Sequence, residues 1–336
     1  MQSVSMQDAP LMSASWREFL GASGARFAHE RVADFGDSAA ELTATGGGAA
    51  VIADLSHLAV LGFAGDDAIA FLQGQLSCDV AALSGDATGW GAYSTPQGRM
   101  LASFQLAREG PIVRMLLARS IAASVAKRLR MFVLRSKVTI TDDTDAVALL
   151  GLAGVEPSGV AGRWHRIAAG RFIGIVPAAE APGAWRTLTA SARPVGVACW
   201  EWLDIEGGLP LITAATQDQL VPQMANLDLI GGISFTKGCY PGQEIVARTK
   251  YLGRIKRRMM RAHVIAEPPP AAGDAIYAAE FGDQASGTIV NTAPSPRGGH
   301  DVLAVLQLAT IETADAHLRA LDGPRLTLRA PPYPLA

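Results

Sequence analysis

Cysteine is scarce in this sequence. Its 336 residues include three cysteines, Cys78, Cys199 and Cys239, and no two of them form a Cys-x-x-Cys pair. They are too few and too far apart for a disulfide framework, and an odd number leaves at least one thiol unpaired. The six histidines are scattered singly, which disfavours a preformed zinc or iron–sulfur site. We therefore expect a reducing compartment and no metal site.

An excess of one charge and long apolar runs are also lacking. The 29 Lys and Arg residues nearly balance 31 Asp and Glu residues, so any affinity for nucleic acid or a membrane must come from a local patch. Apolar runs such as residues 146–155 reach about half of the roughly 18 to 20 residues that a spanning helix needs. The N-terminus shows no signal-peptide pattern. These features predict a cytoplasmic protein without a membrane segment.

Familiar catalytic motifs are missing as well. The sequence contains no Gly-x-Ser-x-Gly nucleophile elbow, no Walker loop and no His-Glu-x-x-His pair. Hydrolases and NTPases are therefore not supported.

The order of the expected elements is that of an α+β fold. At about 100 to 200 residues per domain, the length allows two or three domains. Residues 1–50 are rich in Ala, Gly and Ser and predict a surface extension, because their glycine run follows no expected strand. Periodicity and turn signals then predict a helix from Asp66, a helix from Ser120 to about Met131, and strands over 59–63, 89–94, 99–106, 112–118 and 133–141.

Residues 146–198 form a smaller expected unit. Its strands are predicted over 147–153 and 171–176, and a short helix around 184–192 follows. Another apolar strand is predicted over 195–205. Roughly the last 60 residues predict short strands only (277–279, 286–291, 302–308 and 325–328), which fit a small antiparallel barrel or sandwich.

The most specific segment runs from Lys237 to Glu244 and continues to Arg248. Pro241 suits a first helical turn and Gln243 the turn after it, so Cys239 is expected just ahead of a helix N-terminus.

Two interpretations of Cys239 remain open from spacing alone. The helix end and the Lys237 ammonium both favour a thiolate, which predicts a reactive cysteine. In the alternative, Gly238 and Gly242 only form a tight turn, and Cys239 is a small buried hydrophobe. For the other two cysteines we expect packing.

A second segment, Trp202 to Pro210, carries two carboxylates and an indole. On a strand, the period of two places Trp202, Asp204 and Glu206 on one face. Such a face could line a pocket for a heterocycle such as a pterin, because a carboxylate can accept paired hydrogen bonds from its N–H groups. The alternative is a solvated strand face that ends in a turn.

Two stretches contain many cations and no acid. They are Arg248 to Arg261, with Tyr251 interleaved, and Arg114 to Lys137. If they converge, they predict a surface for RNA or another anionic ligand, because phosphate binding needs clustered Lys and Arg. Otherwise they are two solvated faces.

The Lys237 to Arg248 block resembles the signature of the YgfZ family, folate-binding proteins related in fold to the T-protein of the glycine cleavage system. The likeness covers about residues 51–336. It extends to other segments in the expected order, which are residues 71–76, 204–210, 222–223, 226–227, 231–235 and 332–335.

The resemblance implies a three-part, cloverleaf-like fold. It consists of a folate-binding α+β core (51–145 and 199–248), a smaller ferredoxin-like α/β part (146–198) and a C-terminal antiparallel β-barrel (249–336), preceded by an N-terminal extension with the first strands (1–50).

The resemblance also implies tetrahydrofolate, or a one-carbon derivative, as the cofactor. Glu206 looks like the family's pterin-recognising glutamate, and the other expected cofactor-binding residues are Asp204, Gln75, Asn226, Gln243 and Arg248. The expected role is to maintain or assemble iron–sulfur enzymes, including those that thiolate tRNA. Cys239 is the expected functional thiol, with Lys237 beside it and Gly238, Tyr240, Gly242 and Glu244 completing the motif. The implied partners are reduced folate, iron–sulfur client or assembly proteins, and tRNA through Arg248 to Arg261.

One departure separates this sequence from the transferases it resembles. T-protein relatives use an aspartate in the loop that corresponds to residues 94–98, and here that loop contains none. Thr95 supplies no full negative charge for a developing cation. We therefore expect folate binding without glycine cleavage. The alternatives are a folate-dependent one-carbon transferase and an RNA-binding module.

Overall fold

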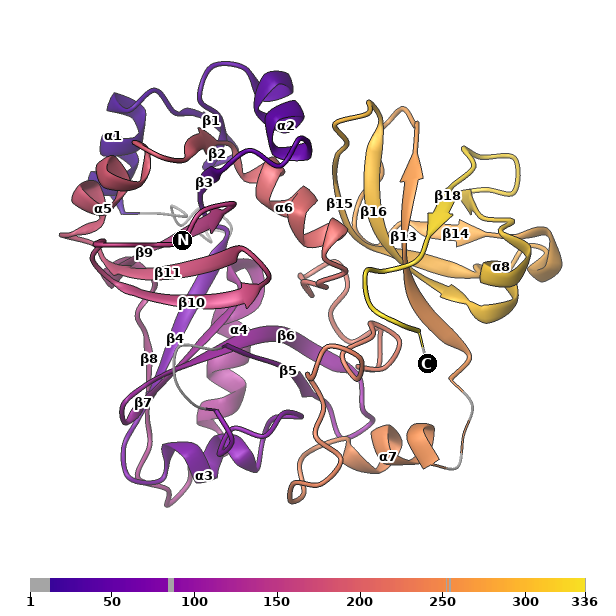
Figure 1. Ribbon diagram of the computed structural model, residues 1–336. Coiled ribbons are helices and arrows are strands. Elements are labelled where there is room, and N and C mark those ends of the chain that lie inside the picture. Colours follow the sequence, from indigo (N-terminus) through magenta and orange to yellow (C-terminus); the bar gives the residue numbers. More distant parts are fainter. Residues whose placement is uncertain (1–12, 84–87, 252, 254, 336) are drawn as a thin grey trace, which may run out of the picture.

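The computed structural model describes residues 13–83, 88–251, 253 and 255–335. Figure 1 shows two lobes, one built on two five-stranded sheets and the other on a curled six-stranded sheet. Strands and helices alternate irregularly along the chain, which confirms the predicted α+β class. Within the described ranges, no helix combines the length and the apolar character needed to cross a bilayer.

The first sheet has the strand order β5-β6-β7-β4-β8. Helix α4 packs on it by burying Ile121, Val125 and Leu129, which are spaced four residues apart and so share one face. The short helix α3 adds Phe71 and Leu72 to the same core. The elements are β4 (Leu58–Ala64), α3 (Ala68–Gln73), β5 (Gly89–Ser94), β6 (Met100–Glu109), β7 (Ile112–Ala118), α4 (Arg119–Arg130) and β8 (Thr139–Asp142).

The predicted strand over 133–141 is wrong in its first part. Only Thr139–Asp142 is a strand, β8. Leu134 has φ +45°, and Ser136 N donates to Val133 O at 2.8 Å. The chain therefore turns here, and the alternating pattern was misleading because several of the side chains point into water.

The second sheet has the strand order β10-β11-β9-β3-β12. Its strands are β3 (Val51–Asp54), β9 (Val147–Ala153), β10 (Arg163–Ala168), β11 (Arg171–Pro177) and β12 (Arg193–Val195). The short helix η1 (Thr144–Ala146) lies directly before β9. Strand β3 lies between β9 and β12, so a boundary between residues 145 and 146 divides one sheet. Strand β10 was not predicted.

The two sheets share a core. Leu58 and Leu116 of the first sheet pack with Leu149 and Ile173 of the second in one buried cluster. The outer face of the second sheet is covered by α1 (Ala14–Ala22) and α5 (Ala181–Leu188), which contribute Trp16, Leu20 and Trp185 to a separate cluster.

Residues 13–50 are not a surface extension, which corrects the prediction for this part of the chain. They form α1, β1 (Arg26–Ala28), β2 (Arg31–Asp34) and α2 (Ser38–Gly46). Trp16 is buried, and its Nε1 donates to Asp54 of β3 at 2.8 Å. The buried Glu41 accepts from the Gly196 N–H at 2.8 Å. Residues 1–12 of the expected extension lie outside the described residues.

The predicted strand over 195–205 is a helix, α6 (Val197–Glu206). A continuous apolar run does not distinguish a buried strand from a buried helix, which is why the pattern misled. Gly196 precedes the helix in an extended conformation, and Gly208, with φ +63°, ends it. Cys199 and Trp200 pack against the second sheet.

The third sheet, here called the barrel sheet, has the order β17-β14-β15-β16-β13-β18 and curls around its own core. It agrees with the predicted small antiparallel barrel, although β13 and the helix α8 were not predicted. A further cluster joins Ile205 of α6 and Met100 of the first sheet to Leu303 of the barrel sheet. The elements are β13 (Arg257–Val264), β14 (Ala275–Tyr277), η2 (Ala279–Phe281), β15 (Gly287–Pro294), β16 (His300–Gln307), α8 (Leu308–Thr313), β17 (His317–Leu318) and β18 (Thr327–Arg329).

Candidate functional site

Cys239 is the exposed cysteine of the three. It lies four residues before the first residue of α7 (Gln243–Tyr251), so it precedes a helix as predicted. Pro241 lies in the turn before α7 and not in its first helical turn, which corrects that part of the prediction. The other two thiols are buried, and burial raises the pKa of Cys78 to about 12 and that of Cys199 to about 11. Packing therefore keeps those two thiols protonated, whereas Cys239 is open to other molecules.

Lys237 reaches back to the end of α3. Its Nζ donates to the carbonyl of Leu76 at 2.5 Å and to the carbonyl of Gln73, and it lies 4.9 Å from the centre of the Tyr240 ring. A cation at a helix C-terminus is favourable because the last carbonyls are unpaired. Burial lowers the pKa of Lys237. The ammonium thus fixes the segment to α3, and its contacts with described residues do not include the Cys239 thiol.

Gly242 brings the Lys237–Glu244 segment against the first sheet. Its φ is +83°, and a Cβ atom added to it would lie 2.7 Å from both Gly98 Cα and Thr95 O. Gly98 is the last residue of the 94–98 turn, which connects β5 to β6. The backbones of the segment and of the turn are therefore in contact. Glycine is required at position 242, because a side chain there would have both an unfavourable φ and too little space.

Two buried polar atoms at the segment have no hydrogen-bond partner among the described residues. They are the Tyr240 hydroxyl and Gln75 Oε1. Burial raises the pKa of Tyr240 to about 12, so the hydroxyl stays protonated. Unpaired buried polar atoms are costly, and these two are available to a water molecule or a ligand.

The remaining predicted residues of this region differ in their surroundings. Glu244 and Arg248 are exposed one helical turn apart on α7, and Gln243 is half-buried. Asn226 is fully buried, and its amide donates to Met259 O at 2.8 Å and accepts from Met259 N at 3.3 Å. The amide of Asn226 is therefore used to join its loop to β13.

Asp204 and Glu206 do not share a face, which corrects the prediction made for a strand. In a helix, residues two apart are about 200° apart around the axis. Asp204 pairs with Arg171 of β11 at 2.6 Å, and burial raises the pKa of its carboxyl group. Glu206 points the other way, toward the barrel sheet.

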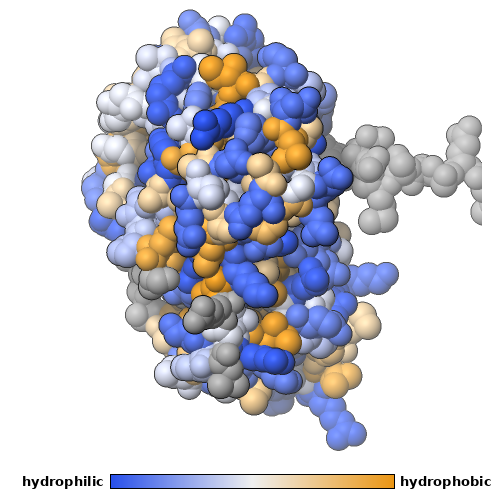
Figure 2. Space-filling view, turned by 90° about the vertical axis from the view of Figure 1, so that its right-hand side faces the viewer, coloured by the Kyte–Doolittle hydropathy of each residue, from blue (hydrophilic) through white to orange (hydrophobic). Residues whose placement is uncertain are grey.

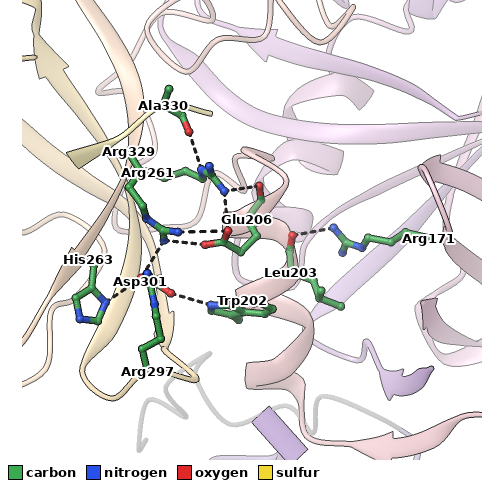
Figure 3. A network of polar contacts seen from close by, with 10 residues as sticks. All are labelled: Arg171, Trp202, Leu203, Glu206, Arg261, His263, Arg297, Asp301, Arg329 and Ala330. Atoms are coloured by element: carbon green, nitrogen blue, oxygen red, sulfur yellow. Dashed lines mark hydrogen bonds and ion pairs between the residues drawn. The ribbon is translucent and has the colours of Figure 1, made fainter. Parts of the chain in front are cut away.

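Glu206 is held by two arginines, as Figure 3 shows. Its Oε2 lies 2.6 Å from Arg261 Nη1 of β13, and its Oε1 lies 2.8 Å from Arg329 Nη2 of β18. A carboxylate has about four lone-pair sites, so both oxygens retain some capacity for a further donor.

A second carboxylate next to Glu206 completes this network. Asp301 is fully buried and accepts from Trp202 Nε1 at 2.8 Å, from Arg329 at 3.1 Å and from Arg297 at 3.0 Å, and it contacts His263 (Figure 3). Burial alone would raise the pKa of Asp301, but these hydrogen bonds hold it below its usual value. The network joins α6 to three strands of the barrel sheet.

Asp204 faces a small cavity of about 30 Å³ between α6 and the two five-stranded sheets. The walls include Trp90, Gln105 and Trp200. Gln105 Oε1 is buried and has no partner in the described part of the chain. These three residues were not predicted from the sequence, because nothing in their local pattern marks them as facing one cavity.

The first basic stretch, Arg248 to Arg261, does not form a single surface. Arg258 is buried and pairs with Asp228 at 2.7 and 3.0 Å, and Arg261 pairs with Glu206. Arg248, Lys250 and Lys256 are exposed, as is Tyr251. Arg254 lies outside the described residues. The interpretation as one cationic face is wrong for Arg258 and Arg261, because the acids that pair with them come from other segments.

The second basic stretch is partly paired in the same way. Arg114 binds Glu109 and Asp143, and Arg119 lies 3.3 Å from Asp145. Among the described residues, no three His, Cys, Asp or Glu side chains gather where they could hold a metal ion.

The fold defines a class. It matches aminomethyltransferase T of the glycine cleavage system from Bartonella henselae with a TM-score of 0.71, covering 96% of this chain and 97% of that one at 14% identity. The chain thus has the fold of the glycine-cleavage T-protein, which confirms the predicted fold class.

Within that class, the chain belongs to the YgfZ family. It is 32% identical to the tRNA-modifying protein YgfZ of Sodalis glossinidius, covering 83% of this chain and 92% of that protein. It is 35% identical to the protein of the same name from Edwardsiella ictaluri, covering 80% and 88%. No family model matches the sequence.

Proposed function

We propose that this chain is a cytoplasmic, tetrahydrofolate-binding accessory protein that supports the assembly or repair of iron–sulfur enzymes, including enzymes that modify tRNA. Cys239 is its working residue. The observation that carries the proposal is the exposure of this one thiol on a segment that Lys237 attaches to α3 and Gly242 to the 94–98 turn. The name of the relatives, tRNA-modifying protein, supports the tRNA link.

The contacts that position the segment argue for a function of Cys239. Lys237 binds the α3 carbonyls, Tyr240 is buried, and Gly242 abuts the 94–98 turn. Exposed free cysteines are uncommon, because thiols oxidise and otherwise favour the core. A thiol presented to solvent from a fixed backbone is suited to react with, or bind, a partner molecule.

The cavity beside Asp204 supports folate binding. Trp90 and Trp200 offer flat surfaces, and the Asp204 carboxylate and the unpaired Gln105 Oε1 offer acceptors. These groups fit the N–H donors of a reduced pterin. At about 30 Å³ the cavity holds one water molecule, so the ring enters only as its walls move apart. When bound, tetrahydrofolate would supply a one-carbon carrier.

Glu206 is the alternative anchor for the pterin, because it lies on the opposite side of α6 from Asp204 and one ring cannot reach both carboxylates. Both of its oxygens are engaged by arginines, so a pterin would share the carboxylate with Arg261 and Arg329 or displace one of them. Among the other predicted ligands, Gln75 offers an unpaired acceptor, and Gln243 and Arg248 lie on α7 beside the Cys239 segment.

Aminomethyl transfer is not favoured. Thr95 stands in the 94–98 turn, and its hydroxyl accepts a hydrogen bond from Arg99 N at 3.2 Å. No carboxylate from this turn is available to stabilise a developing cation. Transfer of a methylene group from an aminomethyl-lipoyl carrier to tetrahydrofolate at an enzymatic rate would contradict the accessory role.

The role of Cys239 is tested by replacing it in cells. A strain without the natural gene is complemented with the wild-type protein, Cys239→Ser or Cys199→Ser, and thiolated tRNA nucleosides are measured by mass spectrometry. We expect a several-fold loss for Cys239→Ser at unchanged protein level and melting temperature. Cys199→Ser is the matched control, and equal nucleoside levels in both variants would refute the role.

Folate binding is tested by anaerobic titration calorimetry with tetrahydrofolate. We expect saturable binding that either Asp204→Asn or Glu206→Ala weakens at least tenfold, according to which side of α6 holds the pterin. Glu244→Ala, which removes an exposed carboxylate of α7, is the control and should bind normally. No heat with the wild-type protein would mean that the fold has been kept for another ligand.

The exposed part of the first basic stretch is the proposed tRNA contact. Arg248, Lys250 and Lys256 are exposed, and the half-buried Phe235 packs edge-on against the exposed Tyr251 with ring centres 6.1 Å apart. If these residues bind tRNA, affinity falls steeply with salt, because phosphate contacts release counterions. A salt-independent interaction would remove this proposal without affecting Cys239.

A further inference from the structure

Three large hydrophobic side chains are exposed next to one another where α4 ends. Met131 is 68% exposed, Phe132 42% and Leu134 87%. Phe132 and Leu134 line an open depression of about 730 Å³. We call residues 131–136 the α4 corner. Contiguous exposed apolar side chains are unusual on a soluble surface and mark interaction sites.

The backbone of the α4 corner holds Leu134 outward. Its φ of +45° lies in the left-handed region, which is unfavourable for a residue with a bulky side chain. Phe132 N donates to Leu129 O at 3.0 Å and Ser136 N to Val133 O at 2.8 Å, so successive turns fix this conformation. The fold thus maintains a strained residue whose side chain adds nothing to the core.

Unneutralised cations surround the α4 corner. Lys127 and Arg135 are exposed, and neither makes an ion pair within the described ranges. Arg130 donates to the carbonyl of Ile140 at 3.1 Å, which leaves its charge uncompensated. The helix dipole explains cations in the last turn of α4, but it does not explain Arg135, which lies beyond the helix.

Two carboxylates lie beside the corner: Asp66 pairs with Lys137, whereas Asp67, which lines the depression, is hydrogen-bonded to the backbone and keeps its charge. Asp66 lies 3.3 Å from Lys137 Nζ, and Asp67 accepts from the Lys137 backbone N–H at 2.8 Å. The surface therefore combines exposed apolar side chains with a net positive charge.

We propose that the α4 corner is the docking site for a partner protein that presents an apolar side chain flanked by carboxylates. Charge complementarity selects the carboxylates, and burial of Phe132 and Leu134 supplies most of the affinity. Nucleic acid would leave the aliphatic Met131 and Leu134 without an apolar surface to cover. Attachment to a lipid surface is instead an outcome of the test below.

The corner and the Cys239 segment flank the same short helix. Lys137 binds Asp66 and Asp67 just before α3, and Lys237 binds the carbonyls at its end. The six residues of α3 span about 9 Å. A docked protein therefore lies at the same end of the molecule as Cys239. That this protein is also the client of Cys239 rests on the function proposed above.

The test is photo-crosslinking in the native host. A photoreactive amino acid is placed at Leu134, and the matched control position is Ile265, which is 75% exposed just after β13. We expect one discrete protein adduct from Leu134 only, joined through a peptide in which Asp or Glu flanks an apolar residue, and the adduct supports the proposal only if the charge reversal below removes it. An RNA or lipid adduct, a peptide without acids, or no adduct above the Ile265 control would overturn the proposal.

Charge reversal separates docking from chance proximity. Lys127→Glu with Arg135→Glu should lower the adduct yield at least tenfold, and Phe132→Ser should do the same. Arg163→Glu, an exposed change on β10, should leave it unchanged. Equal yields in all variants would refute the docking site.

The same strains distinguish this proposal from the proposed function. If Phe132→Ser abolishes the adduct and leaves thiolated tRNA unchanged, docking stands and the link to Cys239 fails. If Cys239→Ser leaves thiolated tRNA unchanged, the proposed function fails while the adduct is unaffected.

Discussion

Gly242 and Gly98 touch through their backbones. A Cβ atom at Gly242 would lie 2.7 Å from the Cα atom of Gly98, which is closer than real Cβ atoms approach a neighbour. Gly242 also has φ +83°. The Cys239 segment is thus positioned by the first sheet, through the turn between β5 and β6.

This contact predicts that alanine is more destabilising at Gly242 than at Gly238 of the same segment. Gly242→Ala should lower the free energy of unfolding by roughly 2 to 4 kcal/mol, from a strained φ and a backbone clash. Gly238→Ala is the control, because a Cβ there meets nothing within 4 Å, and its cost should stay below about 1 kcal/mol. Urea unfolding measures both. Similar values would show that the segment is not held at Gly242.

The three cysteines should differ sharply in reactivity. At a pKa of about 12, roughly one Cys78 thiol in ten thousand is ionised at pH 8, and burial also blocks access. We expect iodoacetamide at pH 8 to label Cys239 alone in the native protein and all three thiols in urea. Mass spectrometry of the labelled peptides provides the measurement. Native labelling of Cys78 or Cys199 would contradict their packing.

Removing the charge of Glu206 should loosen the junction between α6 and the barrel sheet. In Glu206→Gln the guanidinium groups of Arg261 and Arg329 lose their shared counter-charge, at a cost of about 1 to 3 kcal/mol. Glu244→Gln serves as the control on an exposed helix face. Thermal unfolding with and without tetrahydrofolate measures the effect. A melting temperature equal to that of the control would mean that solvent screens these pairs.

The buried pair of Arg258 and Asp228 should be essential for stability. Both side chains are about 95% buried, and Arg258 also donates to Gln223 O at 2.9 Å. Asp228→Asn should therefore cost about 3 to 5 kcal/mol, because an uncompensated charge stays in the core. Lys256→Met, an exposed change two residues earlier, should cost little. Equal losses of stability in Asp228→Asn and Lys256→Met would mean that Arg258 is solvated like a surface cation.

Local sequence patterns predicted most strands of the first and barrel sheets but failed at α6. Strands β5, β7 and β9 occupy the predicted ranges, since alternation and turn residues mark antiparallel hairpins. In α6 the apolar run has no clear period, because Cys199 and Trp200 face the second sheet while Ile205 faces the barrel sheet. A helix that is buried on several sides leaves no amphipathic signal.

The position of Cys239 was predictable, and the surroundings of the other site residues were not. Pro241 indicated a helix start close to Cys239, although the helix begins two residues later than expected, at Gln243. The ion pairs of Asp204 and Glu206 depend on Arg171, Arg261 and Arg329, which come from β11, β13 and β18. Such long-range pairing is set by sheet order, which a single sequence does not encode locally.

The place of β3 in the second sheet affects how the chain folds during synthesis. Strands β4 to β8 lie within residues 58–142, so the first sheet can close as soon as that stretch leaves the ribosome. Strand β3 precedes them, yet it pairs with β9 and with β12 at residues 193–195. Such distant pairing is slow because a long loop must be closed first. We expect β3 to remain unpaired in the nascent chain until β9 has been synthesised, which leaves a strand edge exposed during that time.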